Sequence, residues 1–479
     1  MILIQEGYSC EFEMNIFINI FFDKTDKGNI YTYFSHENDI LSVKTKIEFN
    51  GKEYFGEYSQ KFSSSESDEK LKKRIYCCAC TKSFCIAAKK IRNITLPWGV
   101  MSGIRPAKSV RKYREKGFSD NEIRGLLKSI YDVSDEKIEL AMEVSKNEEM
   151  VLSKIGENSV SVYIGIPFCP SRCLYCSFVS TDIRYSGKYM DGFVECLIKE
   201  IEKTKEILNN FGLHVENVYI GGGTPTTLSA EQLSRILFAV EENLITQKLN
   251  EFTLEAGRAD TITKEKLKAI KSGNVTRISI NPQTANDETL KLIGRKHTFS
   301  DVIEKYNEAR EVGFDDINMD LIAGLPGETP EMFYRSIDEV IALDPENITV
   351  HSMCIKRAAA LNFSGIKLSD ENYIQKMLSY AQKRMRETGR APYYMYRQKN
   401  ISGNSENVGY AKKGKMSFYN INIMEEAQTI IALGGGGASK LVLENDIERV
   451  FNFKDPYEYI RRFDEILDKK DEIERILKR

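Results

Sequence analysis

Three cysteines in one short loop are the residues of this chain whose types and spacing could do the most distinctive chemistry. Cys169, Cys173 and Cys176 follow a Cys-x3-Cys-x2-Cys pattern directly after the strand-like residues 162–166. Thiolates of this kind hold iron–sulfur clusters. A cubane cluster has four irons, so three local cysteines would leave one iron open to another molecule. The pattern therefore indicates a three-cysteine cluster site.

Two other interpretations of the same cysteines predict different chemistry. A structural zinc site needs four closed ligands, but no nearby His or paired Cys completes the set, and Cys196 lies far along a helical stretch. Three buried structural cysteines are the simpler alternative. Pro170 and Arg172, however, favour an exposed, irregular loop over a core strand or helix. The cluster is the better explanation of the spacing.

The middle of the chain repeats a short β-branched run, a polar or Gly-rich turn and a helical segment. Strand candidates cover residues 162–166, 218–221, 252–255, 277–281, 317–321 and 348–351, with helices such as 231–244 and 300–312 between them. Strands that alternate with helices in this way form parallel β/α units. We therefore expect an α/β fold in which six β/α units form a partial barrel, (β/α)6.

Several of these strands end in polar residues or glycines, where the catalytic groups of parallel barrels gather. A glycine run at 221–223 lets backbone amides approach a ligand, although a tight turn explains it equally well. A buried carboxylate such as Glu255 needs either an internal Arg or a ligand ammonium as its partner, and Gln283 and Asp320 carry the same ambiguity. Because all of them fall on one barrel rim with the cysteine loop, a ligand site is favoured.

The length of 479 residues and the 42% of hydrophobic residues predict a folded protein of two or three domains. We expect an N-terminal α+β domain at 1–156, the barrel at 157–364 and a C-terminal α+β region that covers the substrate at 365–479. Within the first, 14–22 and 42–49 are expected to be strands and 69–91 a helix; within the last, 370–387 is expected to be a helix and 393–396 a strand. Four more cysteines, Cys77, Cys78, Cys80 and Cys85, fall in a predicted helix, where packing explains them better than a second metal site.

Charge and hydropathy exclude some classes of partner. The formal net charge of −2 gives no overall positive field for nucleic acid, so an anionic substrate would be held by local Arg and Lys clusters. The longest apolar stretch, 14–22, is too short to span a bilayer. We therefore expect a cytoplasmic protein without a membrane span, with reduced thiols and an anaerobic or reducing setting that suits an exposed cluster.

The cysteine loop after a strand resembles the signature of the radical S-adenosylmethionine (SAM) enzymes. The preceding residues 163–168, Tyr-Ile-Gly-Ile-Pro-Phe, are similar to those of the oxygen-independent coproporphyrinogen III dehydrogenase (oxidase) family. The resemblance implies a [4Fe-4S] cluster on the three cysteines and one or two bound SAM molecules. Residue by residue, it places the first SAM on Tyr163, Gly222, Gly223, Thr224, Glu255, Gln283, Arg295 and Asp320. Arg295 suits this role because a guanidinium can hold the methionyl carboxylate with two hydrogen bonds, although a lone Arg in a helix would otherwise be interpreted as surface.

Three departures from the best-known branch of that family indicate a HemZ-like branch. Ser177 and Phe178 stand where that branch has a fourth cysteine, Gly165 stands at the position of a histidine, and the long N-terminal region is extra. Motifs outside the barrel agree: 96–99, Leu-Pro-Trp-Gly; 103–106, Gly-Ile-Arg-Pro; and 406–410, Glu-Asn-Val-Gly-Tyr. A second glycine run, 434–437, also resembles a family segment and is expected either to line the substrate side or to be a helix C-cap turn.

The reaction that the resemblance implies is oxidative decarboxylation of two propionates of coproporphyrinogen III to vinyl groups. The product is protoporphyrinogen IX, formed without oxygen in porphyrin and haem biosynthesis. The resemblance also implies an electron donor such as flavodoxin or ferredoxin and an external electron acceptor, and it assigns no catalytic side chain beyond the cluster and SAM. Substrate carboxylates need cations, and the candidates are Lys356, Arg357, Arg105 and Arg397.

Two members of the same superfamily give alternative functions. A haem-binding chaperone would carry a His-Asn-x-x-Tyr-Trp motif late in the chain, where residues 419–424 of this sequence are Tyr-Asn-Ile-Asn-Ile-Met. A SAM-dependent haem-degrading methyltransferase would use the same cluster and differ in its substrate. The missing motif favours the decarboxylating enzyme over the chaperone.

Overall fold

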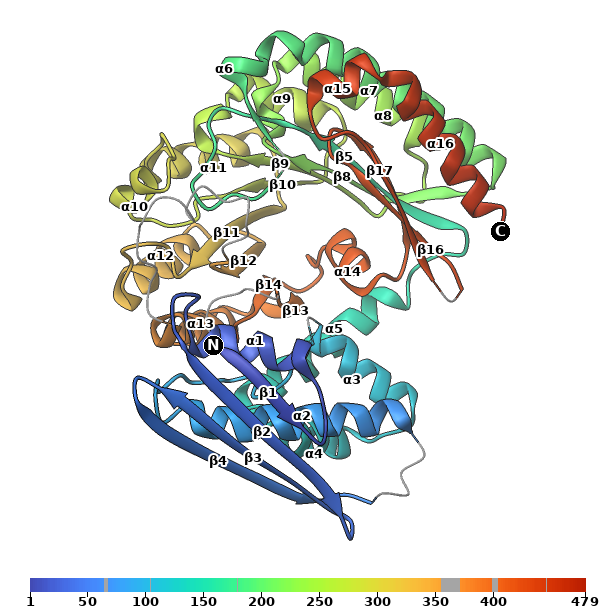
Figure 1. Ribbon diagram of the computed structural model, residues 1–479. Helices are drawn as coiled ribbons and strands as arrows, with labels where there is room; N and C mark the ends of the chain where they lie inside the picture. Colours follow the sequence, from blue (N-terminus) through green and yellow to red (C-terminus); the bar gives the residue numbers. More distant parts are fainter. Residues whose placement is uncertain (64–67, 104, 179, 355–370, 399–403, 445) are drawn as a thin grey trace. The chain divides into compact units, whose positions relative to one another are not determined.

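The chain divides into two compact units in the computed structural model, which describes residues 1–63, 68–103, 105–178, 180–354, 371–398, 404–444 and 446–479 (Figure 1). The first unit comprises Met1–Ser145 with Asp370–Gln375 and Tyr396–Glu406. The second comprises Lys146–Ser369, Lys376–Met395 and Asn407–Arg479. The second unit therefore holds the predicted barrel together with most of the C-terminal region.

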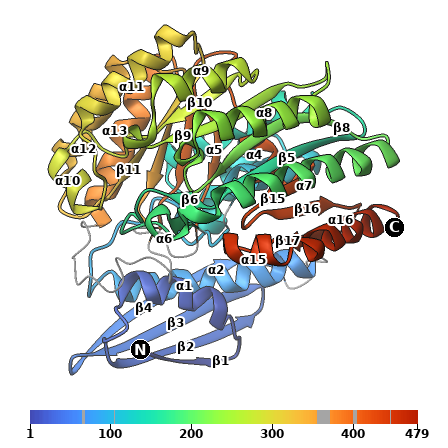
Figure 2. The same cartoon turned by 90° about the horizontal axis from the view of Figure 1, so that it is seen from above.

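The first unit is built on a four-stranded sheet in the order β1-β2-β3-β4, and α2 packs along one face of it (Figure 2). Strand β1 runs parallel to β2, and the other neighbours are antiparallel. The elements that begin in this unit are β1 (Ile2–Glu6), α1 (Glu11–Phe21), β2 (Gly28–Glu37), β3 (Ile40–Phe49), β4 (Lys52–Lys61), α2 (Glu69–Ala88), α3 (Pro106–Glu115), α4 (Asp120–Tyr131) and α5 (Asp135–Leu152). Strand β3 and helix α2 correspond to the predicted strand 42–49 and helix 69–91.

Residues 14–22, in contrast, are not the predicted strand, because most of them belong to helix α1. The buried side chains of this helix are Met14, Phe17, Ile18 and Phe21. They follow the i, i+3, i+4, i+7 spacing of one helix face. Phe21 packs edge-on against Phe84 of α2, with ring centroids 5.9 Å apart. The segment is therefore helical because its buried side chains are spaced to meet α2 from one helix face. The alternation of apolar and polar residues along it wrongly indicated a strand.

The four cysteines of α2 are buried free thiols. Burial raises the pKa of both Cys78 and Cys85 to about 12. These thiols therefore keep their protons at neutral pH and pack as small apolar groups.

Residues of two of the sequence motifs, Trp98 and Glu406, meet inside the first unit, although the rest of the second motif forms β14 (Asn407–Ala411) in the large sheet of the second unit. Glu406 accepts a hydrogen bond of 2.7 Å from the indole N–H of Trp98, and it pairs with Lys137 at 2.7 Å. All three side chains are buried. A carboxylate that lies so deep in the fold is stable only with such partners. Residues that are far apart in the sequence therefore form one polar network in the core of this unit.

The second unit is an α/β fold built on one large, mostly parallel sheet. Within the described residues the strand order is β13-β14-β12-β11-β10-β9-β8-β5-β15-β16-β17. The strands are β5 (Ser159–Ile166), β8 (His214–Gly222), β9 (Glu251–Gly257), β10 (Arg277–Ile280), β11 (Ile317–Ala323), β12 (Asn347–Ser352), β13 (Ala391–Tyr396), β14 (Asn407–Ala411), β15 (Thr429–Gly434), β16 (Ala438–Val442) and β17 (Ile447–Phe451), with the short pair β6 (Phe168–Cys169) and β7 (Thr181–Asp182) beside them. All six predicted barrel strands are confirmed.

The helices of this unit, except α14, lie on the outer side of the sheet, and within the described residues the sheet does not close on itself (Figure 1). They are α6 (Ile183–Ser186), α7 (Met190–Asn210), α8 (Ala230–Leu244), α9 (Lys264–Ser272), α10 (Asp287–Leu292), α11 (Phe299–Val312), α12 (Pro330–Ala342), α13 (Glu371–Glu387), α14 (Phe418–Glu425), α15 (Pro456–Arg461) and α16 (Phe463–Leu477), of which α14 lies on the inner side. Ser229 is the N-cap residue of α8 and Thr298 is that of α11, each with a capping box that satisfies the first free N–H groups. The architecture is therefore a partial barrel that the C-terminal region extends with β15, which pairs in parallel with β5.

A buried carboxylate on α7 holds the C-terminal helices to the barrel. Glu200 is fully buried and pairs with Lys470 of α16 at 2.8 Å. It also accepts hydrogen bonds from the backbone N–H of Gly434 at 2.8 Å, from the side-chain amide of Asn452 at 2.7 Å and from the hydroxyl of Tyr459. One acidic side chain thus gathers donors from β15, α15 and α16, and the last two helices lie beside α7 (Figure 1).

The substitution Lys470→Met tests this anchor. It leaves a buried carboxylate without its cation, and breaking a buried pair in this way costs about 3–5 kcal/mol. We expect a clearly lower midpoint of thermal unfolding, measured by circular dichroism. Lys478→Met is the matched control, because Lys478 is 66% exposed and lies 4.0 Å from its partner. Equal midpoints for the two variants would contradict the anchor.

Candidate functional site

The three loop cysteines lie just beyond the carboxyl end of β5. Cys169 and Cys173 are buried and Cys176 is partly exposed. The sulfur of Cys169 lies 3.5 Å from the hydroxyl of Thr224, which follows the glycine run after β8. Burial raises the pKa of Cys169 and raises that of Cys176 to about 11. A metal therefore has to displace protons from these thiols. Among the residues with described positions, no three His, Cys, Asp or Glu side chains are arranged to hold a single metal ion.

The glycine run after β8 holds the start of the cysteine loop by close backbone contact. The N–H of Gly223 donates to the carbonyl of Ile166 at 2.8 Å, and the N–H of Thr224 donates to that of Phe168 at 2.7 Å. A Cβ on Gly223 would lie only 2.5 Å from the Phe168 oxygen. Gly222 has a φ of +108°, which residues with side chains rarely adopt. The glycines are therefore required by the loop itself, whatever ligand they also approach.

Polar side chains of neighbouring strands point to the inner side of the barrel sheet. Tyr163 is paired in register with Tyr219, Glu255 with Ser279, and Asp320 with Thr349. The residues that alternate with them on β5, Val162 and Ile164, are completely buried. Tyr163, Tyr219, Glu255, Asp320 and His351 are only partly buried. The inner face of the barrel is therefore polar and accessible, while the outer face is an apolar core beneath the helices.

Glu255 is a carboxyl group of this inner face whose pKa is shifted toward neutral pH. It accepts a hydrogen bond from the hydroxyl of Tyr219. The Tyr219 ring stacks on Tyr419 of α14, with centroids 4.6 Å apart. Burial raises the pKa of Glu255 to about 7, with the Tyr219 hydrogen bond acting against this rise and the charge of Asp320 adding to it. The carboxyl group is therefore poised to ionise near neutral pH.

Asp320, in contrast, is ionised. Its carboxylate accepts a hydrogen bond of 2.8 Å from the amide of Asn318 and lies 3.7 Å from Nε2 of His351. Burial acts to raise its pKa, but contacts with His351 and Asn318 hold the pKa below its usual value. Near neutral pH Asp320 is therefore charged while Glu255 is only partly ionised, and perturbed pKa values of this kind cluster at functional sites.

The turn after β10 places Gln283 in a strained conformation. Its φ is +68°, its N–H donates to the carbonyl of Asp320 at 2.9 Å, and its own carbonyl accepts from the N–H of Ile322 at 3.0 Å. A non-glycine residue in this region costs about 1–3 kcal/mol, and such residues cluster at functional sites. The turn is therefore pinned to β11 beside Asp320.

Arg295 lies in the loop after α10 and is buried, so the expected alternative of a surface arginine in a helix is wrong. Its guanidinium donates to the carbonyl of Asn281 at 2.6 Å and to the hydroxyl of Tyr175 at 3.2 Å. Its Nε, and the side-chain oxygen of Asn281, are buried without a hydrogen-bond partner among the described residues. These two atoms are left for a ligand to satisfy, because buried polar atoms are normally paired.

The second glycine run is a strand end, so its interpretation as a helix C-cap is wrong. Gly434 ends β15 with a φ of +77°, and the N–H of Gly435 donates to the carbonyl of Gly165 at 2.9 Å. A Cβ on Gly165 would lie 2.6 Å from the Gly435 oxygen. A side chain therefore has no room at position 165, where the better-known branch is expected to carry a histidine.

Of the four cations proposed for the substrate, the structure describes two, and neither belongs to the barrel unit. Lys356 and Arg357 lie outside the described residues. Arg105, at the start of α3, and Arg397 belong to the first unit. Arg397 is buried and donates to the carbonyls of Met101 at 2.7 Å and Gly103 at 3.1 Å, so its guanidinium already serves the fold of that unit.

Sequence reasoning missed four residues at this rim: Tyr175, Tyr219, Arg258 and His351. Tyr219 could have been found from the two-residue period that puts it on the face of Gly221. Arg258 and His351 lie beside strand ends, a position that deserves weight in a parallel barrel. Tyr175 lies between two of the cysteines but carries no signal of its own. It packs beside the apolar cluster that contains Leu290 and Leu325.

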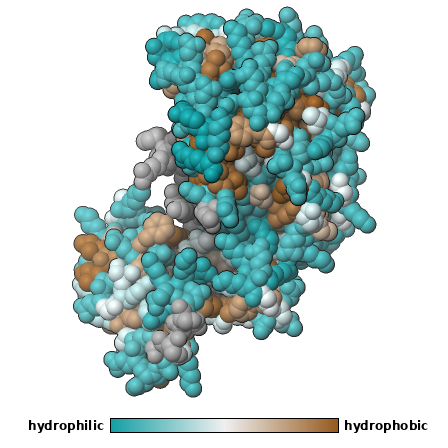
Figure 3. Space-filling model, turned by 90° about the vertical axis from the view of Figure 1, so that its right-hand side faces the viewer, coloured by the Kyte–Doolittle hydropathy of each residue, from teal (hydrophilic) through white to brown (hydrophobic). Residues whose placement is uncertain are grey.

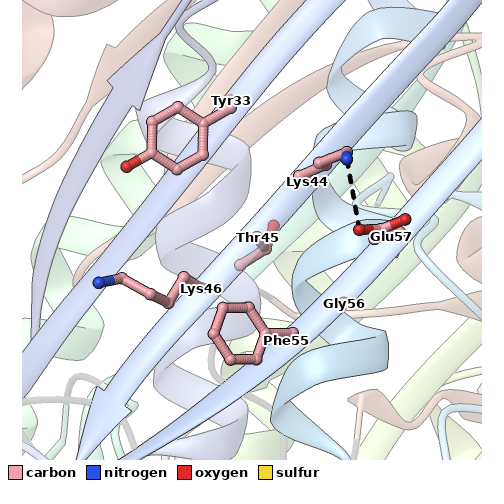
Figure 4. Close-up of a pocket in the computed structure, with 7 residues that line it drawn as sticks. All are labelled: Tyr33, Lys44, Thr45, Lys46, Phe55, Gly56 and Glu57. Atoms are coloured by element: carbon pink, nitrogen blue, oxygen red, sulfur yellow. Dashed lines mark ion pairs between the residues drawn. The ribbon is translucent and has the colours of Figure 1, made fainter.

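A shallow hollow on the sheet of the first unit is not a comparable site. Tyr33, Phe55, Lys44, Lys46 and Glu57 line it together with Thr45 and Gly56 (Figure 4). Lys44 and Glu57 already pair with each other at 3.6 Å.

On the face that Figure 3 shows, hydrophilic residues predominate. In the described part of the chain, no helix is both long and apolar enough to cross a membrane.

Comparisons with known proteins agree with this geometry. The model of the radical SAM superfamily matches residues 163–340. The oxygen-independent coproporphyrinogen-III oxidase-like protein HemZ of Bacillus subtilis is 42% identical over 386 residues, which are 79% of this chain and 77% of HemZ. The haem chaperone HemW of the same organism is 37% identical over 199 residues, which are 41% of this chain and 51% of HemW. The structure of coproporphyrinogen III oxidase (HemN) of Escherichia coli superposes with a TM-score of 0.53 at 22% identity, over 67% of this chain and 72% of HemN.

The residues at the rim fit the cofactors of that superfamily, a [4Fe-4S] cluster and SAM. Three cysteines supply three thiolates, and the loop offers no fourth. The partly exposed inner face presents carboxyl groups for an ammonium, and the unsatisfied atoms of Arg295 and Asn281 suit a carboxylate and a donor. With this fold, this loop and a relative matched along most of its length, the chain belongs to the radical SAM superfamily, in the group of coproporphyrinogen III oxidase-like proteins that includes HemZ.

Proposed function

We propose that this protein catalyses the oxygen-independent oxidative decarboxylation of coproporphyrinogen III to protoporphyrinogen IX. The observation that carries the proposal is the match to HemZ, whose name describes it as oxidase-like, over 79% of this chain. The polar inner face that begins at the cluster loop supports it, because a substrate that is to react there needs contact with both the loop and an accessible cavity wall. The electron donor is of the flavodoxin or ferredoxin class.

SAM is held by the residues that surround the loop. The proposed set is Tyr163, Gly222, Gly223, Thr224, Glu255, Gln283, Arg295 and Asp320, with the cluster on Cys169, Cys173 and Cys176. Glu255 takes the methionyl ammonium, because an opposite charge lowers the pKa of a buried carboxyl group and favours its ionised form. Arg295 takes the methionyl carboxylate through its unsatisfied Nε.

The reduced cluster and SAM together supply a carbon radical, and the radical chemistry belongs to them. From each propionate, one β-hydrogen atom is removed, the bond to the carboxylate breaks, carbon dioxide leaves, and the remaining electron passes to an external acceptor as the vinyl group forms. The chain positions the propionate and excludes water. Gly165 has no room for a side chain, so position 165 supplies no proton donor.

The chaperone alternative is supported by the 37% identity to HemW, but over only 41% of this chain. The segment that replaces the expected chaperone motif forms helix α14. Tyr419 is buried there and stacks on Tyr219, and Ile421 is completely buried. These side chains pack inside the fold, Tyr419 against a tyrosine of the inner face, so they are not available to bind haem on a surface.

Anaerobic turnover tests the proposed reaction directly. The protein is reconstituted with iron and sulfide and then given SAM, a reductant and coproporphyrinogen III. We expect 5′-deoxyadenosine and the divinyl product, detected by chromatography. Formation of 5′-deoxyadenosine without vinyl product, together with tight binding of haem, would establish the chaperone instead.

The substitution Cys173→Ala tests the cluster site. We expect the variant to bind less iron and sulfide and to form no 5′-deoxyadenosine, because a cubane held by two thiolates loses a ligand that nothing nearby replaces. Cys196→Ala is the matched control, since Cys196 is a partly buried thiol of α7. If Cys173→Ala retained a wild-type cluster signal after reduction, the assignment of the ligands would be wrong.

Glu255 predicts a specific dependence on pH. In the folded protein its pKa is raised from 4.5 to about 7, so the folded state holds a proton that the unfolded chain has lost. Stability is therefore highest below pH 4.5 as far as this group is concerned, and it falls as pH rises from 4.5 to 7, by at most about 3 kcal/mol. Glu255→Gln should remove this fall in thermal stability of the SAM-free protein.

Bound SAM should stabilise the ionised form of Glu255, because the SAM ammonium pairs with the Glu255 carboxylate. We expect SAM affinity, measured by calorimetry, to increase between pH 6 and pH 8 in the wild type and to be weak and nearly constant in Glu255→Gln. Identical pH profiles for the two proteins would show that Glu255 does not bind the ammonium.

A further inference from the structure

Arg258 lies in a buried network that reaches one of the cluster cysteines. It is the residue directly after β9, and only 3% of it is exposed. Its Nη1 donates to the carbonyl of Ser171 at 3.0 Å and to the Ser171 hydroxyl at 3.0 Å, and it lies 3.8 Å from the sulfur of Cys173. One guanidinium nitrogen therefore contacts the loop between its first and second cysteines.

The rest of the guanidinium is fixed by Asp260. Nε and Nη2 of Arg258 donate to the two carboxylate oxygens at 2.9 Å and 2.7 Å. His297 Nδ1 lies 3.4 Å from the same carboxylate. Burial acts to raise the pKa of Asp260, but contacts with His297 and Arg258 hold it well below its usual range. The two-point contact sets the plane of the guanidinium, so Nη1 is directed at the loop.

A second contact closes the network on the other side of the loop. The Ser171 hydroxyl donates to the carbonyl of Gly294 at 3.3 Å, and the N–H of Leu174 donates to that of Ile293 at 3.0 Å. The residues around Cys173 are thus held between the segment after β9 and the segment after α10. The guanidinium of Arg295 also interacts with Cys173, whereas the sulfur of Cys169 contacts the hydroxyl of Thr224.

We infer that Arg258 is a positioning residue for the cluster, which fixes Cys173 and raises the reduction potential of the bound cluster through an N–H···S hydrogen bond. Reduction adds one negative charge to the cluster and its thiolates. A cationic donor to a ligand sulfur stabilises the more negative, reduced form, and hydrogen bonds to the sulfurs are among the main determinants of cluster potential. The inference rests on the cofactor and not on the proposed reaction with coproporphyrinogen III.

A purely structural role would predict a different result. If Arg258 only filled space and satisfied Asp260, removing its donor would lower the stability of the protein and leave the potential of any bound cluster unchanged. A role toward the sulfur requires the potential to change even in protein that is fully folded and fully loaded. The midpoint potential is therefore the decisive measurement.

The experiment compares Arg258→Gln and Arg258→Lys with the wild type after anaerobic reconstitution. Iron and sulfide content, the rate of iron loss to a chelator, and the midpoint potential from a redox titration followed by electron paramagnetic resonance are measured without porphyrin. Arg390→Gln is the matched control, since Arg390 is equally buried but contacts Pro345 and Asp344 before the start of β12. Loss of an outer partner of a metal ligand weakens metal binding by about 10- to 100-fold.

We expect Arg258→Gln to lose iron about tenfold faster than the wild type and to have a more negative midpoint potential. Arg258→Lys should load normally, because it keeps the charge, yet its potential should also be more negative, since one amino group cannot serve Asp260, Ser171 and Cys173 together. If Arg258→Gln does not load at all while Arg390→Gln does, the positioning role is supported and Arg258→Lys decides the potential. Wild-type potentials in the variants that load would overturn the inference, whereas failure to convert coproporphyrinogen III would overturn only the proposed reaction.

Discussion

The close approach of two backbones at the ends of β5 and β8 is the constraint on which the site depends. The N–H groups of Gly223 and Thr224 bond to carbonyls on either side of Pro167, at a distance that excludes any side chain at position 223. This contact brings Thr224 to Cys169 and fixes the start of the cysteine loop. Parallel strands deliver their ends to one edge of the sheet, but only glycines let these two ends touch. A cluster site could not form at this edge with a bulkier turn.

The barrel separates two kinds of environment across a single sheet. Its outer side chains, such as Val162 and Ile164, are completely buried beneath helices and supply the hydrophobic stabilisation. Its inner side chains are tyrosines, carboxyl groups and a histidine that are held by one another. Because the period of a strand is two, each strand contributes to both environments at once. The side chains that stabilise the fold and those that line the site therefore come from alternate residues of the same strands.

Much of this arrangement could be predicted from the sequence, and the reasons are physical. The six parallel strands carry a strong signal because they are buried runs of β-branched residues between helices, and the cysteine spacing specifies its own chemistry. The error at residues 14–22 arose because Met14, Ile16, Ile18 and Ile20 recur at every second position, as in a strand, and only the presence of α2 decides which side chains are buried. Strand β15 was missed because its short run before glycines resembles a helix end, and its partner β5 lies far away in the sequence. Arg258 and Tyr219 were missed because a hydrogen bond between distant segments leaves no pattern in either segment.

The position of β15 has a consequence for how the protein is made. Strand β5, which leads into the cysteine loop, lies between β8 and β15, and β15 follows all six predicted barrel strands in the sequence. During synthesis, one edge of β5 therefore stays unpaired until β15 has left the ribosome. Contacts this distant in sequence form slowly, since a long loop must close first. Delivery of iron and sulfide before that moment would meet a nascent chain whose binding loop has only half of its support, so assembly of the cluster belongs after the synthesis of β15.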